Sequence, residues 1–149
     1  MIKKTHLAIG LVLGLLFLPH VSHKILFIPI ILIASLVPDI DCAYSYLGHM
    51  KIFRPLQWFV RHRGLIHSFV FCVFICLICA LFVPVIALPL FLGYFGHLFA
   101  DSLCVEGILP FWPLKKTLSG KIRVGGSVEH GVFIGLVLVN IALFVSWFV

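Results

Sequence analysis

Long apolar stretches separated by short polar breaks dominate the chain. Five of them are candidates for helices that cross a membrane: residues 5–21, 25–37, 65–83, 84–103 and 128–149. A crossing helix needs about 20 apolar residues, so the second stretch is short and leaves open a re-entrant hairpin formed with the first. We predict a single-domain, all-α membrane protein with four or five transmembrane helices.

The segment between the second and third stretches has a different pattern. Residues 42–64 interleave aromatic and basic side chains, for example Trp58 and Phe59 with Arg54. Such a mixture is typical of a segment that lies in the membrane interface. Residues 105–127 form the one long polar stretch, which we expect to be a cytoplasmic loop.

The composition excludes two broad classes of protein. Of the 149 residues, 62% are apolar and 11% are charged, and the mean hydropathy is +1.22. A soluble domain of this size could not bury so much apolar surface, and a disordered chain has the opposite composition. An ordinary cytosolic enzyme and a disordered chain are therefore both excluded.

The basic residues predict the sidedness. With five crossings, ten of the 11 Lys and Arg residues fall on one side and only Lys24 on the other. Because basic loops remain in the cytoplasm, we predict a multi-pass inner-membrane protein with a cytoplasmic N-terminus. The net charge of +6 suits anionic lipid headgroups, and the absence of a long basic run argues against nucleic acid. The first 24 residues also resemble a signal peptide, which we expect to be retained because no small-residue cleavage site follows.

Ionisable residues gather at the ends of the apolar stretches. All five carboxylates fall at a predicted cytoplasmic end or beside it: Asp39, Asp41, Asp101, Glu106 and Glu129. Four histidines are expected at the same level: His6, His62, His67 and His97. Ionisable groups at membrane depth are costly, so a cluster of them is a functional hypothesis by default.

Local spacing supports a shared location. Pro38 tends to end the preceding helix before Asp39 and Asp41. His97 and Asp101 are four residues apart, which places them on one face of a helix. Arg63 and His67 have the same spacing and would share a face where the third helix begins. Gly64 would allow His62 to turn inward.

Imidazole combined with carboxylate is the ligand mixture of Zn²⁺, Mn²⁺ or Fe²⁺ hydrolytic sites. The predicted ligands are His6, Asp39, Asp41, His62, His67, His97, Asp101 and Glu129. Four of them are carboxylates, whose charge two divalent cations would neutralise, so we predict two ions, with Zn²⁺ favoured over Mn²⁺ or Fe²⁺. Arg63 would hold a phosphate oxygen through its planar guanidinium. Arg63, Asp101 and Glu129 are the candidate catalytic residues.

These residues resemble the YdjM-like family of membrane-bound metal-dependent hydrolases. The likeness covers nearly the whole chain and rests on His6, Pro38-Asp39-Ile40-Asp41, His62-Arg63-Gly64-x-x-His67-Ser68, Gly96-His97-x-x-x-Asp101, Gly107 and Glu129. The resemblance implies hydrolysis at a metal site and names no substrate. This chain has Ile66 and Cys104 where family members often have threonine.

The predicted function is therefore metal-dependent hydrolysis of a phosphoester or another ester, lipid-linked or small, at the cytoplasmic leaflet. An ion-coupled transporter or a proton or metal pathway that uses the same cluster is the main alternative. A metal-stabilised structural protein without turnover is the third. A conducting pathway would distribute polar groups through the membrane, whereas the third and fifth stretches are apolar beyond their cytoplasmic ends, which favours a site.

Overall fold

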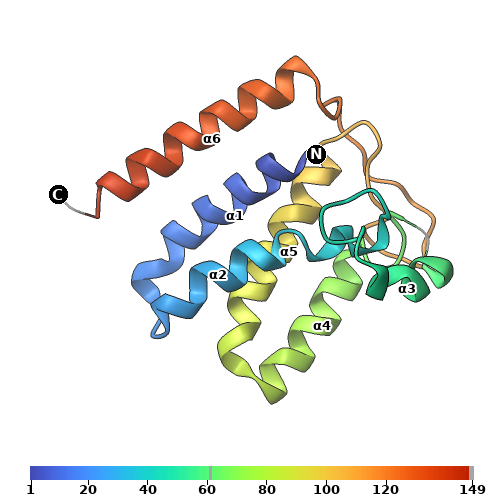
Figure 1. Ribbon diagram of the computed structural model, residues 1–149, viewed down its shortest axis with the longest axis horizontal. Coiled ribbons are helices and arrows are strands. Elements are labelled where there is room, and N and C mark those ends of the chain that lie inside the picture. The colour runs from blue at the N-terminus through green and yellow to red at the C-terminus, as the bar shows by residue number, and fades with distance from the viewer. Residues whose placement is uncertain (61, 148–149) are drawn as a thin grey trace.

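The computed structural model describes residues 1–60 and 62–147, which form helices and no β-strand (Figure 1). The α-helices are α1 (Lys3–Phe17), α2 (Lys24–Ala34), α3 (Arg54–Phe59), α4 (Phe69–Phe82), α5 (Pro84–Ser102) and α6 (Ser127–Val145). The 3₁₀ helices are η1 (Leu18–His20), η2 (Val37–Asp41) and η3 (Lys51–Phe53). The all-helical prediction is confirmed.

Within the described residues, two helices, α5 and α6, are long and apolar enough to cross a membrane. Helices α1, α2 and α4 have 15, 11 and 14 residues, fewer than the roughly 20 of a full crossing. The number of four or five crossings therefore stays a prediction.

Helix α5 is central, and α1, α2 and α4 pack against it (Figure 1). The backbones of α5 and α2 come so close at Gly93 that a methyl group there would overlap the carbonyl oxygen of Ile31. Small residues serve this purpose in membrane proteins because lipid supplies no hydrophobic force between helices. Helix α6 lies along α1.

The third helix begins later than predicted. Helix α4 starts at Phe69, where the Ser68 hydroxyl accepts a hydrogen bond from the Phe71 N–H. Arg63, with a φ of 61°, adopts a left-handed conformation that ends regular helix geometry. The prediction that Arg63 and His67 share a helix face is therefore wrong, because both lie in the turn before the helix.

The two segments predicted outside the membrane contain little regular structure. Residues 42–64 include only η3 and α3 as helices among the described residues, and α3 leaves Trp58 and Phe59 largely exposed. Residues 103–126 fold back through two isolated β-bridges, one between Cys104 and Ile122 and one between Ile108 and Leu118. The interfacial position of residues 42–64 stays a prediction.

Candidate metal centre

Four side chains from three segments converge where α2 and α5 end and α4 begins. The Nε2 atom of His97 lies 3.6 Å from Asp39 Oδ1 and 3.6 Å from Asp101 Oδ2. The Nε2 atom of His67 lies 3.7 Å from each of the same two oxygens. Two nitrogens and two oxygens thus alternate around one small space. We refer to Asp39, His67, His97 and Asp101 as the four-donor cluster.

Each imidazole of the cluster is oriented by its other ring nitrogen. His97 Nδ1 lies 2.8 Å from the Ser35 carbonyl oxygen, which can only accept, so Nδ1 carries the proton. His67 Nδ1 is oriented in the same way by Asp41 Oδ2, at 3.0 Å. Both Nε2 atoms are buried and lack a hydrogen-bond partner among the described residues. Because buried polar atoms are almost always paired, this pair of orphaned nitrogens marks a place that could hold an ion.

Asp41 lies behind the four-donor cluster. Its Oδ1 accepts a hydrogen bond from His62 Nδ1 at 2.6 Å, and its Oδ2 also accepts one from the Arg63 backbone N–H at 3.3 Å. Together with His62 and His67, Asp41 also forms one of three groups whose donor atoms could share an ion. A carboxylate that holds an imidazole from behind is typical of the outer shell of metal centres.

His6 lies at the edge of the cluster. Its Nε2 is 3.4 Å from Asp101 Oδ1, and its ring stacks on His97 with centroids 3.8 Å apart. Its Nδ1 is buried without a hydrogen-bond partner among the described residues. The amino group of Met1 also contacts Asp101 Oδ1. His6, His97 and Asp101 form one of the other groups that could hold an ion, and Asp39, His67 and His97 form the third.

Glu129 does not join any of these groups among the described residues. Its Oε1 accepts hydrogen bonds from the Ile2 N–H at 2.6 Å and the Thr5 hydroxyl at 3.1 Å. Its Oε2 accepts one from the Gly125 N–H at 2.6 Å. The fully buried carboxylate therefore joins the start of α6 to the first turn of α1.

Arg63 lies at the mouth of the cluster. Its Nη2 is 3.7 Å from Asp101 Oδ2, and its Nη1 donates a hydrogen bond to the Gly107 carbonyl oxygen at 3.1 Å. Glu106, whose role the sequence left open, has Oε2 3.9 Å from Nη1. The Arg63 side chain is 20% exposed and that of Asp39 is 23% exposed, against 3% or less for the rest of the cluster. A ligand could therefore approach from the side of Arg63 and Asp39.

The carboxylates of η2 are held in their ionised form. Burial alone would raise the pKa of Asp39, but its contact with His67 and the neighbouring imidazoles lower the pKa to about 2. Burial also opposes the ionisation of Asp41, and hydrogen bonds to His62 and His67 outweigh it and lower its pKa. Both carboxylates are therefore negative at neutral pH.

His67 shows the complementary shift. Burial would lower its pKa, but the neighbouring carboxylates of Asp39, Asp41 and Asp101 outweigh burial and raise it to about 9. Without a cation, a proton therefore balances the carboxylates at this position. Metal binding in proteins displaces such protons from its ligands.

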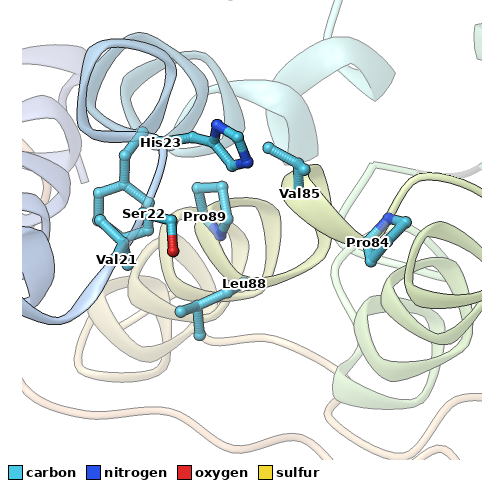
Figure 2. A pocket seen from close by; sticks show the side chains of 8 residues that line it. Val21, Ser22, His23, Pro84, Val85, Leu88 and Pro89 are labelled. Carbon is cyan, nitrogen blue, oxygen red and sulfur yellow. The ribbon is translucent and has the colours of Figure 1, made fainter.

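Two further histidines lie outside the candidate ion-holding groups. Figure 2 shows His23 at a small pocket of about 160 Å³, located between the start of α2 and the start of α5, at the other end of these helices. None of the described residues that line this pocket is acidic. His130 is exposed, and its Nδ1 lies 2.9 Å from the Gly126 carbonyl oxygen.

Sequence reasoning missed the backbone groups that support the site. The carbonyl oxygens of Ser35 and Gly107 fix His97 and Arg63, respectively. Neither contact involves the side chain of the supporting residue, so no residue type in the sequence marks it. At Gly107 the glycine itself is an indirect sign of a special backbone position, because its φ of 62° lies in a region that favours glycine.

These features define a helical membrane protein with a His/Asp centre at one end of its helices. The model of the YdjM inner membrane protein family matches residues 1–149, and the chain belongs to that family. It is 34% identical over 98 residues to the inner membrane protein YdjM of Escherichia coli (strain K12) and to that of Shigella flexneri. Each match covers 59% of this chain and 50% of the relative, so the chain spans about half the length of the curated relatives it matches. No solved structure matches. The family resemblance and the inner-membrane assignment are thus confirmed.

Proposed function

We propose that the chain is a membrane-embedded, metal-dependent hydrolase that acts on a phosphoester or another ester at the cytoplasmic leaflet. The observation that carries this proposal is the pair of unpartnered, buried imidazole nitrogens facing two carboxylate oxygens at 3.6–3.7 Å. The asymmetry of Lys and Arg supports a multi-pass topology with a cytoplasmic N-terminus.

The donor set fits a divalent transition-metal ion. Donor atoms about 2.0–2.2 Å from a tetrahedral zinc ion stand roughly 3.3–3.6 Å apart, and the nitrogen–oxygen distances of the cluster, 3.6–3.7 Å, lie close to this range. The mixture of two imidazoles and two carboxylates suits Zn²⁺, with Mn²⁺ and Fe²⁺ as alternatives. When bound, the ion would supply Lewis-acid chemistry to an ester.

The surroundings of the carboxylates favour one ion over the two expected from charge counting. Asp41 is shared between two imidazoles, and Glu129 is saturated by three hydrogen bonds. Among the described residues, only the carboxylates of Asp39 and Asp101 face the orphaned nitrogens, and one divalent ion balances their two charges. We assign Asp41 to the orientation of His67 and Glu129 to the α1–α6 junction, which leaves His6 and His62 as the predicted ligands that could take part in a second ion site.

Two residues at the mouth would act on the substrate. The Arg63 guanidinium would bind an anionic oxygen of a phosphoester through its planar fork. His62 is 40% exposed and hydrogen-bonded to Asp41, and imidazole is the side chain best suited to proton transfer near neutral pH. The low pKa of Asp39 makes that carboxylate a poor general base.

The test uses the full chain purified in detergent. Elemental analysis should find about one transition-metal ion per chain, and chromogenic phosphomonoester, phosphodiester and carboxylic-ester substrates should be hydrolysed only by the metal-loaded protein. Asp101→Asn should abolish turnover, whereas His130→Gln, which alters an exposed side chain outside the candidate ion-holding groups, should retain most of it. A folded protein that holds its metal but cleaves none of these esters would support a structural role. Ion movement in proteoliposomes without hydrolysis would support transport.

A further inference from the structure

An open groove of about 890 Å³ runs along α1, between α2 and α6. Its walls include Leu7, Leu11 and Leu15 of α1, Leu32 of α2, and Val137 and Ile141 of α6. Figure 1 shows α6 lying along α1 at the edge of the bundle. Since α6 has only 11% of its apolar window buried, this side of the molecule faces the surrounding lipid.

The two ends of the groove differ in charge. Lys4, in the first turn of α1, is the one charged side chain among the described residues that line it, while Leu18 and Phe144 lie at the far end. The Lys4 side chain is exposed and makes no ion pair among the described residues. The groove therefore presents a cation at the end of the helices that carries the four-donor cluster.

The length of the groove matches a lipid chain. Lys4 and Leu18 are separated by about 21 Å at roughly 1.5 Å per helical residue. Half of the hydrocarbon core of a bilayer is about 15 Å thick, so one leaflet's acyl chain fits between the two ends. The headgroup of such a lipid would lie beside Lys4.

Asn140 lines the groove where α6 meets α1. Its Nδ2 donates hydrogen bonds to the Ala8 carbonyl at 3.1 Å and the Leu136 carbonyl at 2.9 Å. The first of these bonds joins α6 to α1 and therefore helps to fix the relative position of the two helices that form the groove.

We propose that this groove binds one acyl chain of an anionic phospholipid, whose phosphate pairs with Lys4. Lipid tails are as apolar as leucine, so apolar contact alone does not select an occupant within a bilayer. Selection comes from the charge at Lys4, and one basic residue at a membrane surface favours an anionic lipid about fivefold. The proposal is independent of the hydrolase assignment.

The charge test compares two adjacent lysines. The full chain is delipidated in detergent, supplied with phosphatidylglycerol or phosphatidylcholine of equal chain length, and the bound lipid is counted by native mass spectrometry. We expect one tightly held phosphatidylglycerol and an approximately fivefold preference over phosphatidylcholine. Lys4→Gln should remove the preference. Lys3→Gln removes the same charge but should preserve it, because Lys3 Nζ lies 3.6 Å from the centroid of the Tyr46 ring and does not line the groove.

The shape test fills the groove from α6. Val137→Trp places an indole in it and should abolish lipid retention, while Val139→Trp, at another exposed position of α6 outside the groove, should not. If Val137→Trp fails to fold, Ile141→Trp serves in its place. Retention of lipid by a folded filled variant, or equal behaviour of the two lysine variants, would overturn the proposal. A wild-type dimer that Val137→Trp converts to a monomer would instead assign the groove to a second copy. The metal content of every variant is measured as well. An unchanged metal content shows that the change in lipid binding does not result from damage to the metal centre.

Discussion

The four-donor cluster and the α1–α6 junction at Glu129 both place carboxylates near the start of α1, but the groups around these carboxylates differ. At Glu129, two N–H groups and one hydroxyl satisfy the carboxylate. At Asp39 and Asp101, the facing imidazole nitrogens have no hydrogen-bond partner among the described residues. Burial of a carboxylate therefore does not identify a metal ligand. The unpartnered imidazole nitrogens that face the carboxylate are the distinguishing feature.

The largest effect is expected from Asp39→Asn. The change keeps the shape of the side chain but removes one of the two charges that face the orphaned nitrogens. Loss of a residue that only orients a metal ligand costs about 10–100-fold in metal affinity. For a ligand itself we expect metal affinity to fall by at least about 100-fold, measured by competition with a fluorescent zinc chelator. Glu106→Gln, on the same side of the cluster, is the matched control. Wild-type affinity in Asp39→Asn would contradict the one-ion assignment.

Removal of the metal should destabilise the whole helix-end region. An ion at about 100 times its dissociation constant stabilises the folded state by roughly 2.7 kcal/mol. We therefore expect a chelator to lower the thermal unfolding temperature in detergent, and Zn²⁺ to restore it. A chelator should have no further effect on Asp39→Asn. Identical melting of the wild-type protein with and without chelator would place the ion elsewhere.

Asp41→Asn should have an intermediate effect. An amide can replace only one of the two acceptors that receive the His62 and His67 ring protons, so one imidazole loses its orientation. We expect metal affinity to fall about 10–100-fold, as for other outer-shell carboxylates. His62→Ala is the matched variant: it leaves the bond from His67 to Asp41 intact and should change metal affinity much less. If the two variants weaken binding equally, His62 itself is a ligand.

The sequence predicts those parts of the site that depend on local geometry. His97 and Asp101 meet because residues four apart share a helix face. Pro38 does not itself end α2, which already ends at Ala34. It lies in the 3₁₀ helix η2, next to Asp39. His67 was placed correctly in the cluster for the wrong reason. Its position depends on the left-handed backbone of Arg63, a conformation that residue type does not announce.

Tertiary partners explain why the rest could not be predicted. Glu129 resembles the other carboxylates in sequence position, but its partners are backbone N–H groups of residues 2 and 125. Those groups are free because Ile2 precedes α1 and Gly125 lies in a turn, and which carboxylate reaches them depends on how α6 docks on α1. The charge count behind the prediction of two ions did not include the hydrogen bonds to Asp41 and Glu129, and the number of ions stays a prediction.

The smallest effect on metal binding is expected from Glu129→Gln. The amide nitrogen would face an N–H group of Ile2 or Gly125, so at least one buried donor loses its acceptor. We expect a loss of about 1–2 kcal/mol in the free energy of unfolding, measured by equilibrium unfolding in mixed micelles, with metal affinity unchanged. Thr5→Val removes only the hydroxyl bond and should cost about 1 kcal/mol or less. If Glu129→Gln instead loses its metal as Asp39→Asn does, the junction and the cluster are one site, and the orphaned nitrogens do not mark the ligands.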